Sequence, residues 1–323
     1  MKKWAPRVLL AAALAGLSAF LLKGDVWTFW TWWLLAFLMG MVAMPVTGRL
    51  FAGFEDKGWM FSKVLAITVT GFLTWFLVTA KILPFTAATC IGVSVVCAVG
   101  CGVLYHFQGK NGIDCFPSGK VNLIYGEEIL FFIFFSDMDF ILQDSVRRHT
   151  ELRNFMDYGF MEAMMRSTTL PARDLWYSEG TINYYYGGQY FAVFLTKLTG
   201  SKVELTYNLM RTFVAAFAFV LPFSLVCQMS VDRLKGSLTG KKRCVPAVAG
   251  IIAGLSVSIA GNMHYVVYSK IIHGSRSCRE EKRTATGSRM RPVILDTIRM
   301  CRTRRSMNFH VIPLCWEISM PMW

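Results

Sequence analysis

The side chains best suited to chemistry lie close together, between residues 155 and 200. The candidates for a site are Asp157, Arg166, Asp174, Trp176, Glu179, Tyr184, Tyr185 and Tyr186. A carboxylate such as Asp157 can deprotonate a hydroxyl or hold a metal against a phosphate. Aromatic rings pack on the apolar faces of sugars, and arginine pairs with phosphate. This combination favours sugar transfer from a phosphate-linked donor, with Asp157 as the catalytic group and the other residues binding substrate.

A purely structural interpretation of the same residues stays open. Asp157 would then cap a helix, and the tyrosines would form an aromatic belt at the membrane surface. The nine cysteines show no CxxC or Cys/His spacing typical of zinc. The sequence therefore predicts no metal-ligand set, although a divalent cation held by a carboxylate remains an option as cofactor.

Membrane-spanning helices must position these side chains, because the apolar residues fall in long runs. Of 323 residues, 54% are hydrophobic and 17% are charged. A run of about 20 apolar residues crosses the hydrocarbon as a helix, which alone satisfies its own backbone there. The expected spans are Val8–Leu22, Val26–Val46, Trp59–Val78, Leu83–Phe107, Ile124–Leu142, Leu205–Met229 and Val245–Val267. These runs predict an all-α, polytopic bundle of about seven transmembrane helices.

Basic residues orient this bundle. They gather on alternate loops, at Lys2, Lys3 and Arg7, at Arg49, Lys57 and Lys63, at Lys110 and Lys120, and at Arg233, Lys235, Lys241, Lys242 and Arg243. Positively charged loops stay in the cytoplasm, so we expect a multi-pass cell-membrane protein, in contact with membrane lipid, whose N-terminus is cytoplasmic. The segment from residue 143 to 204 is then outside, and Tyr184–Leu198 lies along the outer interface or dips in and returns.

Two acidic residues, Glu127 and Glu128, begin the fifth expected span. A carboxylate that enters a membrane is a functional candidate by default. At the cytoplasmic end of a helix, placement at the membrane interface is the alternative explanation.

A family resemblance is carried by the residues around the triple tyrosine. The shared features are Met156-Asp157, Leu170-Pro171, Asp174-Leu175-Trp176, Gly180, Ile182-Asn183, Tyr184-Tyr185-Tyr186 and Tyr207-Asn208, with Asp56-Lys57-Gly58-Trp59 upstream. They resemble the YYY (DUF2298-like) family of bacterial and archaeal multi-spanning membrane proteins. The resemblance covers most of residues 26–272. The family usually has proline where this chain has Ala172 and Leu175.

The YYY family is in turn similar to the membrane glycosyltransferases of the GT-C type. Those enzymes carry acidic residues on the first outer loop and use a sugar donor linked to a polyprenyl phosphate. The resemblance therefore implies a hexosyltransferase with a polyprenyl-phosphate-linked donor. The alternative is a non-enzymatic transporter or assembly factor for glycan or lipid, in which Asp157 would tolerate replacement by Asn.

The segment after Ile272 changes character, because its apolar spans cease and 10 of the 34 basic residues fall in residues 273–323. A one-base shift after the Ile272 codon allows this segment to encode the Tyr-Trp-Phe-Pro-Asp and Asp-Leu-His-Ala-His elements of the family. A similar shift within 136–154 restores a family-like Thr-Glu-Lys ahead of Phe155. We therefore expect a transmembrane domain over 1–272, with 136–154 out of frame, and a disordered out-of-frame tail over 273–323. The chain would be truncated and inactive as written, and its net charge of +14 would not indicate a nucleic-acid partner.

Overall fold

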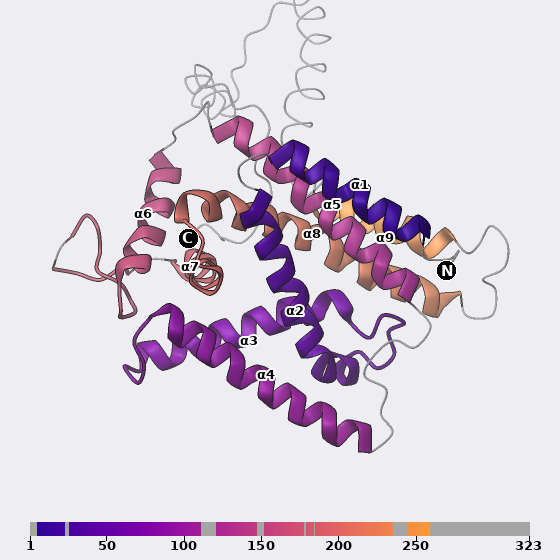
Figure 1. Cartoon of the computed structure of the whole chain (residues 1–323), viewed down its shortest axis with the longest axis horizontal. Coiled ribbons are helices and arrows are strands. Elements are labelled where there is room, and N and C mark those ends of the chain that lie inside the picture. Colours follow the sequence, from indigo (N-terminus) through magenta and orange to yellow (C-terminus); the bar gives the residue numbers. More distant parts are fainter. Residues whose placement is uncertain are drawn as a thin grey trace, which may run out of the picture. The chain divides into compact units, whose positions relative to one another are not determined.

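The computed structural model describes residues 5–22, 26–110, 121–146, 152–177, 179–183, 185–234 and 244–258. The helices in Figure 1 are α1 (Ala5–Leu22), α2 (Val26–Leu50), α3 (Trp59–Thr79), α4 (Ala87–Lys110), α5 (Val121–Val146), α6 (Leu152–Arg166), α7 (Gly187–Thr199), α8 (Val203–Arg233) and α9 (Val245–Ser258). Within these ranges the β-structure consists of one isolated antiparallel bridge, between Arg173 and Thr181. The prediction of an all-α protein is confirmed.

Each expected span corresponds to a helix. In the described part of the chain, four helices are long and apolar enough to cross a membrane, namely α2, α3, α4 and α8, and α9 is a shorter apolar helix. The expected first and fifth spans correspond to α1 and α5. A helical membrane bundle is therefore confirmed, and its clearest spans number four where the sequence predicts about seven.

Helix α2 lies between two groups of helices, with α3 and α4 on one side and α8 on the other (Figure 1). Aromatic rings fill the interior where α2, α5 and α8 meet. Phe29 of α2 stacks on Phe135 of α5 with ring centres 4.5 Å apart, and Phe131 of α5 lies 4.8 Å from Phe217 of α8. Such pairs contribute about 0.5–1.5 kcal/mol each beyond the area they bury. The sequence supplies them as aromatic residues that recur along each of these spans.

Helices α2 and α3 approach closely because Gly40 presents no side chain to α3. A Cβ atom at Gly40 would lie 2.7 Å from Cγ of Lys63. The turn between the helices also requires glycine, since Gly58 has a left-handed φ of 72° and a Cβ there would lie 2.6 Å from the Phe51 ring. Glycine adopts this conformation without steric cost. These two glycines bring the start of α3 against α2.

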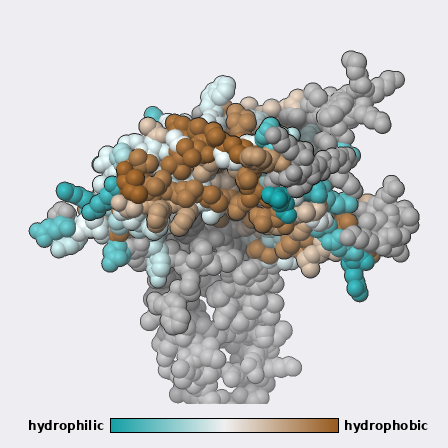
Figure 2. All heavy atoms as spheres, turned by 90° about the horizontal axis from the view of Figure 1, so that it is seen from below, coloured by the Kyte–Doolittle hydropathy of each residue, from teal (hydrophilic) through white to brown (hydrophobic). Residues whose placement is uncertain are grey.

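Helix α4 packs on α2 and α3 along one face and exposes apolar side chains on the remainder. The exposed residues are Ile91, Val95, Val96, Val99, Val103, Leu104 and Phe107. Figure 2 shows a broad apolar surface on this side of the molecule. A helix that is apolar all round must be covered by protein or lipid, so this surface fits the membrane interior.

The segment expected along the outer interface forms helix α7, and protein covers most of it. Its residues from Gln189 to Lys197 are buried except for the partly exposed Phe191, and it packs against α2, α4, α6 and α8. The Tyr190 hydroxyl donates a 2.7 Å hydrogen bond to the carbonyl of Gly71 in α3. Gly200, with φ 65°, ends the helix. The apolar character of this segment thus reflects packing inside the protein as much as contact with a membrane surface.

Candidate functional site

Asp157, the catalytic candidate from the sequence, lies on α6 beside α7. The side-chain amide of Gln189 donates a 2.8 Å hydrogen bond to Oδ1 of Asp157. Gln189 is buried and Asp157 is half-buried. A buried amide holds its partner in one orientation because an unpaired amide would be costly. The carboxylate of Asp157 is therefore fixed in direction while part of it still meets solvent.

Helix α8 contributes Tyr207, on which the charge of Asp157 acts, and Arg211, which lies over the Tyr207 ring. The charge of Asp157 acts on the hydroxyl of Tyr207, and the Tyr158 ring meets the Tyr207 ring edge-on with centres 6.2 Å apart. One turn along α8, the guanidinium of Arg211 lies 5.9 Å from the centre of the Tyr207 ring. Among the described residues the ion pairs are Lys63–Glu128 and Arg166–Glu162, and Arg211 takes part in neither. We refer to Asp157, Gln189, Tyr207 and Arg211 as the Asp157 site.

Arg166, the predicted phosphate ligand, lies elsewhere on α6. It is nine residues from Asp157, which corresponds to roughly 13 Å along the axis and to the opposite face of the helix. Its guanidinium forms an exposed ion pair with Glu162 at 3.2 Å. The structure therefore places Arg166 on the face of α6 opposite Asp157, whereas Arg211 lies on α8 beside Tyr207.

Asp174 organises the loop between α6 and α7. Its carboxylate accepts hydrogen bonds from the backbone N–H groups of Trp176, at 2.8 Å, and Tyr177, at 3.3 Å. The backbone N–H of Asp174 donates to the carbonyl of Gly180, and that of Ile182 donates to the carbonyl of Ala172. These bonds make a narrow hairpin, in which Asp174 has a turn-forming role.

The remaining predicted residues are distributed along this loop. Trp176 is exposed and meets the ring of Phe160 edge-on at 5.7 Å, and Glu179 lies 3.5 Å from the Tyr177 hydroxyl. Tyr185 is exposed. The hydroxyl of Tyr186 accepts a 3.1 Å hydrogen bond from the indole of Trp75. Tyr184 lies outside the described residues.

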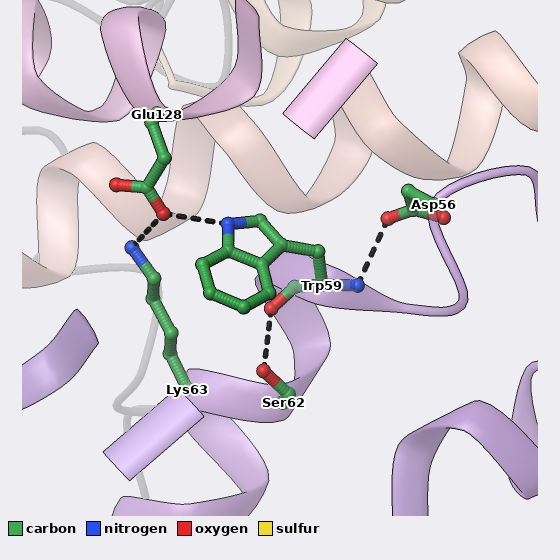
Figure 3. A network of polar contacts seen from close by, with 5 residues as sticks. All are labelled: Asp56, Trp59, Ser62, Lys63 and Glu128. Atoms are coloured by element: carbon green, nitrogen blue, oxygen red, sulfur yellow. Dashed lines mark hydrogen bonds and ion pairs between the residues drawn. The ribbon is translucent and has the colours of Figure 1, made fainter. Parts of the chain in front are cut away.

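A second polar group lies where α3, α5, α8 and the turn before α3 meet (Figure 3). We refer to Asp56, Trp59, Lys63, Glu127, Glu128 and Ser224 as the Lys63 cluster. Lys63 is fully buried and forms an ion pair with Glu128. The Trp59 indole donates a 2.6 Å hydrogen bond to the same carboxylate. The ammonium also lies 4.6 Å from the centre of the Phe131 ring, so that aromatic faces share in stabilising the cation.

Asp56 is held at the start of α3. It accepts hydrogen bonds from the backbone N–H groups of Gly58 and Trp59, at 3.2 and 3.0 Å, and from the Ser224 hydroxyl at 3.3 Å. The positive end of the α3 dipole also favours a negative charge here. Burial nevertheless raises the pKa of Asp56 above its ordinary value, and the three donors oppose that increase.

Glu127 and Glu128 are both buried within the protein, with exposed fractions of 1% and 9%. Sequence reasoning offered either function or placement at the membrane interface for them. It did not connect them with Lys63 and Asp56, because these residues are more than sixty positions away in the chain. The sequence feature that could have pointed to this cluster is the Asp56-Lys57-Gly58-Trp59 motif, because Lys63 follows Trp59 by about one helical turn.

The two groups are well separated. Tyr207 of the Asp157 site and Ser224 of the Lys63 cluster both lie on α8, seventeen residues apart. This spacing corresponds to roughly 25 Å along a helix. The molecule therefore carries two separate polar sites, one near the start of α8 and one in its second half.

A buried lysine ties α7 to its neighbours. The ammonium of Lys197 donates to the carbonyls of Phe85 and Met165, each at 3.0 Å, and lies 4.5 Å from the centre of the Phe85 ring. Met165 is in the last turn of α6, where the helix dipole favours a cation. Burial lowers the pKa of Lys197. This lysine fixes α7, and with it Gln189, relative to α6.

The part of the chain that the structure describes brings together no group of three or more His, Cys, Asp or Glu side chains able to hold a metal ion. These donors do not fit a metal centre built by the protein alone.

Comparison with known proteins identifies a family. Neither the curated proteins nor the solved structures gave a match. The family profile described as uncharacterized membrane protein (DUF2298) matches residues 69–290, a range that includes α4 to α9 and ends beyond Ile272. Together with the apolar helices, this match indicates a membrane location. Because it covers more than half of the sequence, the chain belongs to the DUF2298 family of uncharacterized membrane proteins.

Proposed function

We propose that this fold transfers a sugar from a polyprenyl-phosphate-linked donor to an acceptor hydroxyl, with Asp157 as general base. The observation that carries the proposal is the 2.8 Å hydrogen bond from Gln189 to Asp157. It orients a half-buried carboxylate whose charge acts on Tyr207, and the guanidinium of Arg211 lies 5.9 Å from the centre of that tyrosine's ring. A positioned base and a nearby cation are the two groups that this reaction requires.

In the proposed reaction Asp157 accepts the proton of the acceptor hydroxyl. The acceptor oxygen then forms a bond to the anomeric carbon, and the bond from that carbon to the donor phosphate breaks. The departing polyprenyl phosphate takes both bonding electrons, and Arg211 offsets its developing charge. Trp176 and Tyr185, both exposed, offer aromatic faces to the sugars.

An assay of sugar transfer by purified, frame-restored protein tests this proposal. Asp157→Asn keeps the shape and a hydrogen-bonding oxygen but removes the base, so the rate should fall by about 10²–10⁴-fold. Arg211→Gln should raise the KM for donor, whereas Tyr185→Phe, which keeps the ring, should mainly weaken binding. Arg166→Gln is the comparison for Arg211→Gln and should have the smaller effect. Full activity of correctly folded Asp157→Asn protein would refute the assignment.

The reading frame is part of this proposal. We propose that residues 136–154 and 273–323 are read out of frame and that the chain as written is inactive. The support is the family-like sequence that a one-base shift restores in each segment. The tail lies outside the described residues, as do 147–151. Resequencing the gene tests this proposal directly, and an unchanged reading frame would refute it.

The distribution of basic loops also bears on the orientation of the chain in the cell membrane. We propose that the N-terminus and the loop around Leu238 are cytoplasmic and that Gly180 lies outside, as the alternation of basic loops indicates. Single cysteines at positions 180 and 238 should differ in their labelling by an impermeant reagent in intact cells. Equal labelling of both would contradict this topology.

The second candidate function is a transporter or assembly factor for glycan or lipid. One observation favours it, namely the charged Lys63 cluster inside the helix bundle, since buried ionisable groups often mark transport pathways. Purified protein in vesicles would then move a polyprenyl-linked glycan across the bilayer without breaking its phosphate–sugar bond. Asp157→Asn should leave that movement intact.

A further inference from the structure

The Lys63 cluster contains more buried carboxylates than cations. The titratable groups that face one another there are Glu55 and Asp56 from the turn, Lys63 from α3, Glu127 and Glu128 from α5, and Cys227 from α8. Lys63 is the one ammonium among them. If Asp56, Glu127 and Glu128 were all ionised, two negative charges would remain after Lys63 is counted. Buried charge without a partner is expensive, and a group in that position gives up its charge instead.

Glu128 is the carboxylate that Lys63 neutralises. One oxygen of Glu128 receives both the ammonium and the Trp59 indole N–H. Lys63 is surrounded by the rings of Phe37, Trp59 and Phe131, which leaves it directed at this carboxylate. The two uncompensated charges would therefore lie on Asp56 and Glu127, and a proton bound to either group removes one of them.

Asp56 is better equipped than Glu127 to carry that charge. Its oxygens receive three donors and lie at the positive end of the α3 dipole. Glu127, in contrast, is 99% buried, and its Oε2 has no hydrogen-bond partner among the described residues. Its neighbours Asp56 and Glu128 both repel a negative charge on it.

The Ser224 hydroxyl stands between the two carboxyl groups. It donates its hydrogen to Oδ2 of Asp56 at 3.3 Å and is also hydrogen-bonded to Glu127. A hydroxyl has one hydrogen to donate but can accept as well. While that hydrogen lies on the Asp56 side, a bond between Ser224 and Glu127 needs Glu127 as the donor, and a carboxyl group donates only when it is protonated. With the hydrogen turned toward Glu127, the hydroxyl instead stabilises the ionised form of Glu127.

We propose that Asp56, Ser224 and Glu127 form a proton-binding site, in which the two carboxyl groups share one proton through the serine hydroxyl. With the proton on Glu127, Glu127 donates to Ser224 and Ser224 donates to the Asp56 carboxylate. If both hydrogens move the other way, Asp56 becomes protonated and Glu127 ionised, with no change in total charge. The shared proton resides mainly on Glu127 because the backbone donors stabilise the ionised form of Asp56.

This site does not depend on the proposed sugar transfer. It lies roughly 25 Å along α8 from the Asp157 site, and its residues join α3, α5 and α8. Loss of the proton would place a further negative charge where these helices meet. Proton release at this site should therefore loosen the contact of α5 with α3 and α8.

Infrared spectroscopy of the full chain in lipid nanodiscs tests the proposal. Exposed Asp and Glu side chains are ionised at neutral pH, so a C=O stretch band of a protonated carboxyl that persists there reports a retained proton. We expect this band in the wild-type protein, its loss in Glu127→Gln and its displacement to higher frequency in Ser224→Ala, where a hydrogen bond is lost. Glu162→Gln, which alters a surface ion pair, is the matched control and should leave the band unchanged.

Four results would overturn the proposal. The first is a wild-type spectrum without the band at neutral pH, a measurement that needs no variant to fold. The second is a band that persists equally in Glu127→Gln and Asp56→Asn. The third is loss of the band when sodium is added at constant pH, which would indicate that the site binds a metal cation rather than a proton. If Glu127→Gln fails to fold, an unchanged band in Ser224→Ala would likewise overturn it.

Discussion

Replacing Lys63 by methionine tests the energetic role of the ion pair inside the bundle. Methionine is unbranched and of similar length, so it can keep the contacts with Phe37, Trp59 and Phe131 while it removes the ammonium. Glu128, which is 9% exposed, would then keep the Trp59 indole as a donor but lose its counter-charge. Removal of one partner from a buried ion pair costs about 3–5 kcal/mol. Sulfur–aromatic contacts of about 0.3–1.5 kcal/mol would offset only part of this loss.

The measurement is the free energy of unfolding of detergent-solubilised protein, followed by tryptophan fluorescence and by far-UV circular dichroism. Lys63→Met should lower it by several kcal/mol. The double variant Lys63→Met/Glu128→Gln should recover most of the loss, because glutamine accepts the Trp59 hydrogen bond without a charge.

The matched control is Arg166→Met, which breaks the exposed pair with Glu162. Exposed pairs contribute about 0–1 kcal/mol, so this variant should be nearly neutral. If Lys63→Met costs no more than Arg166→Met, or if Glu128→Gln gives no recovery, the buried ion pair does not stabilise the fold as argued.

Three further perturbations are measured as shifts in unfolding. Burial raises the pKa of Asp56, so the folded protein binds a proton at this carboxyl group more tightly than the unfolded chain does. The stability should therefore fall as pH rises from the ordinary aspartate range through the raised pKa. Thermal melts at stepped pH measure this, and Asp56→Asn should make the melting temperature depend less on pH. Gly71→Ala places a Cβ atom 2.4 Å from the Phe191 ring and should lower the free energy of unfolding by about 1–3 kcal/mol. Its control, Gly92→Ala, meets nothing within 4 Å and should be neutral or stabilising by up to ~1 kcal/mol. Equal effects of the two variants would refute the steric argument. Lys197→Met leaves the carbonyls of Phe85 and Met165 without their donor and should lower the free energy of unfolding by about 1–3 kcal/mol for each carbonyl. An unchanged unfolding curve would show that other donors replace the ammonium.

Sequence reasoning succeeded where the information is local. A run of apolar residues of bilayer length must form a helix, since no other backbone conformation satisfies its own hydrogen bonds in lipid. The helices accordingly appear where the runs predict them, as α3 does over Trp59–Thr79 against an expected Trp59–Val78. The membrane character of the protein follows from the same pattern and is supported by the family match.

The predicted site was less accessible to sequence reasoning, because its residues are adjacent in the chain but not in space. Arg166 and Asp157 share a helix, yet a spacing of nine residues places them on opposite faces. Asp174 uses its carboxylate to form a turn. Asp157 instead receives a hydrogen bond from Gln189 on α7, and its charge acts on the hydroxyl of Tyr207 on α8.

The amino-acid sequence by itself determined the helices, the family and the types of residue that gather near residue 157, because hydrophobic period and local motifs are properties of short segments. Only the tertiary structure decided which polar groups meet. Lys63 and Glu128 are 65 positions apart, and Asp56 and Ser224 are 168 apart. Contacts of this separation depend on how α3, α5 and α8 pack, and that packing depends on small residues such as Gly40, whose missing side chain allows α3 to approach α2. In the sequence, a charged residue within an apolar span stands alone. Its partner can be identified only from the packing of the helices.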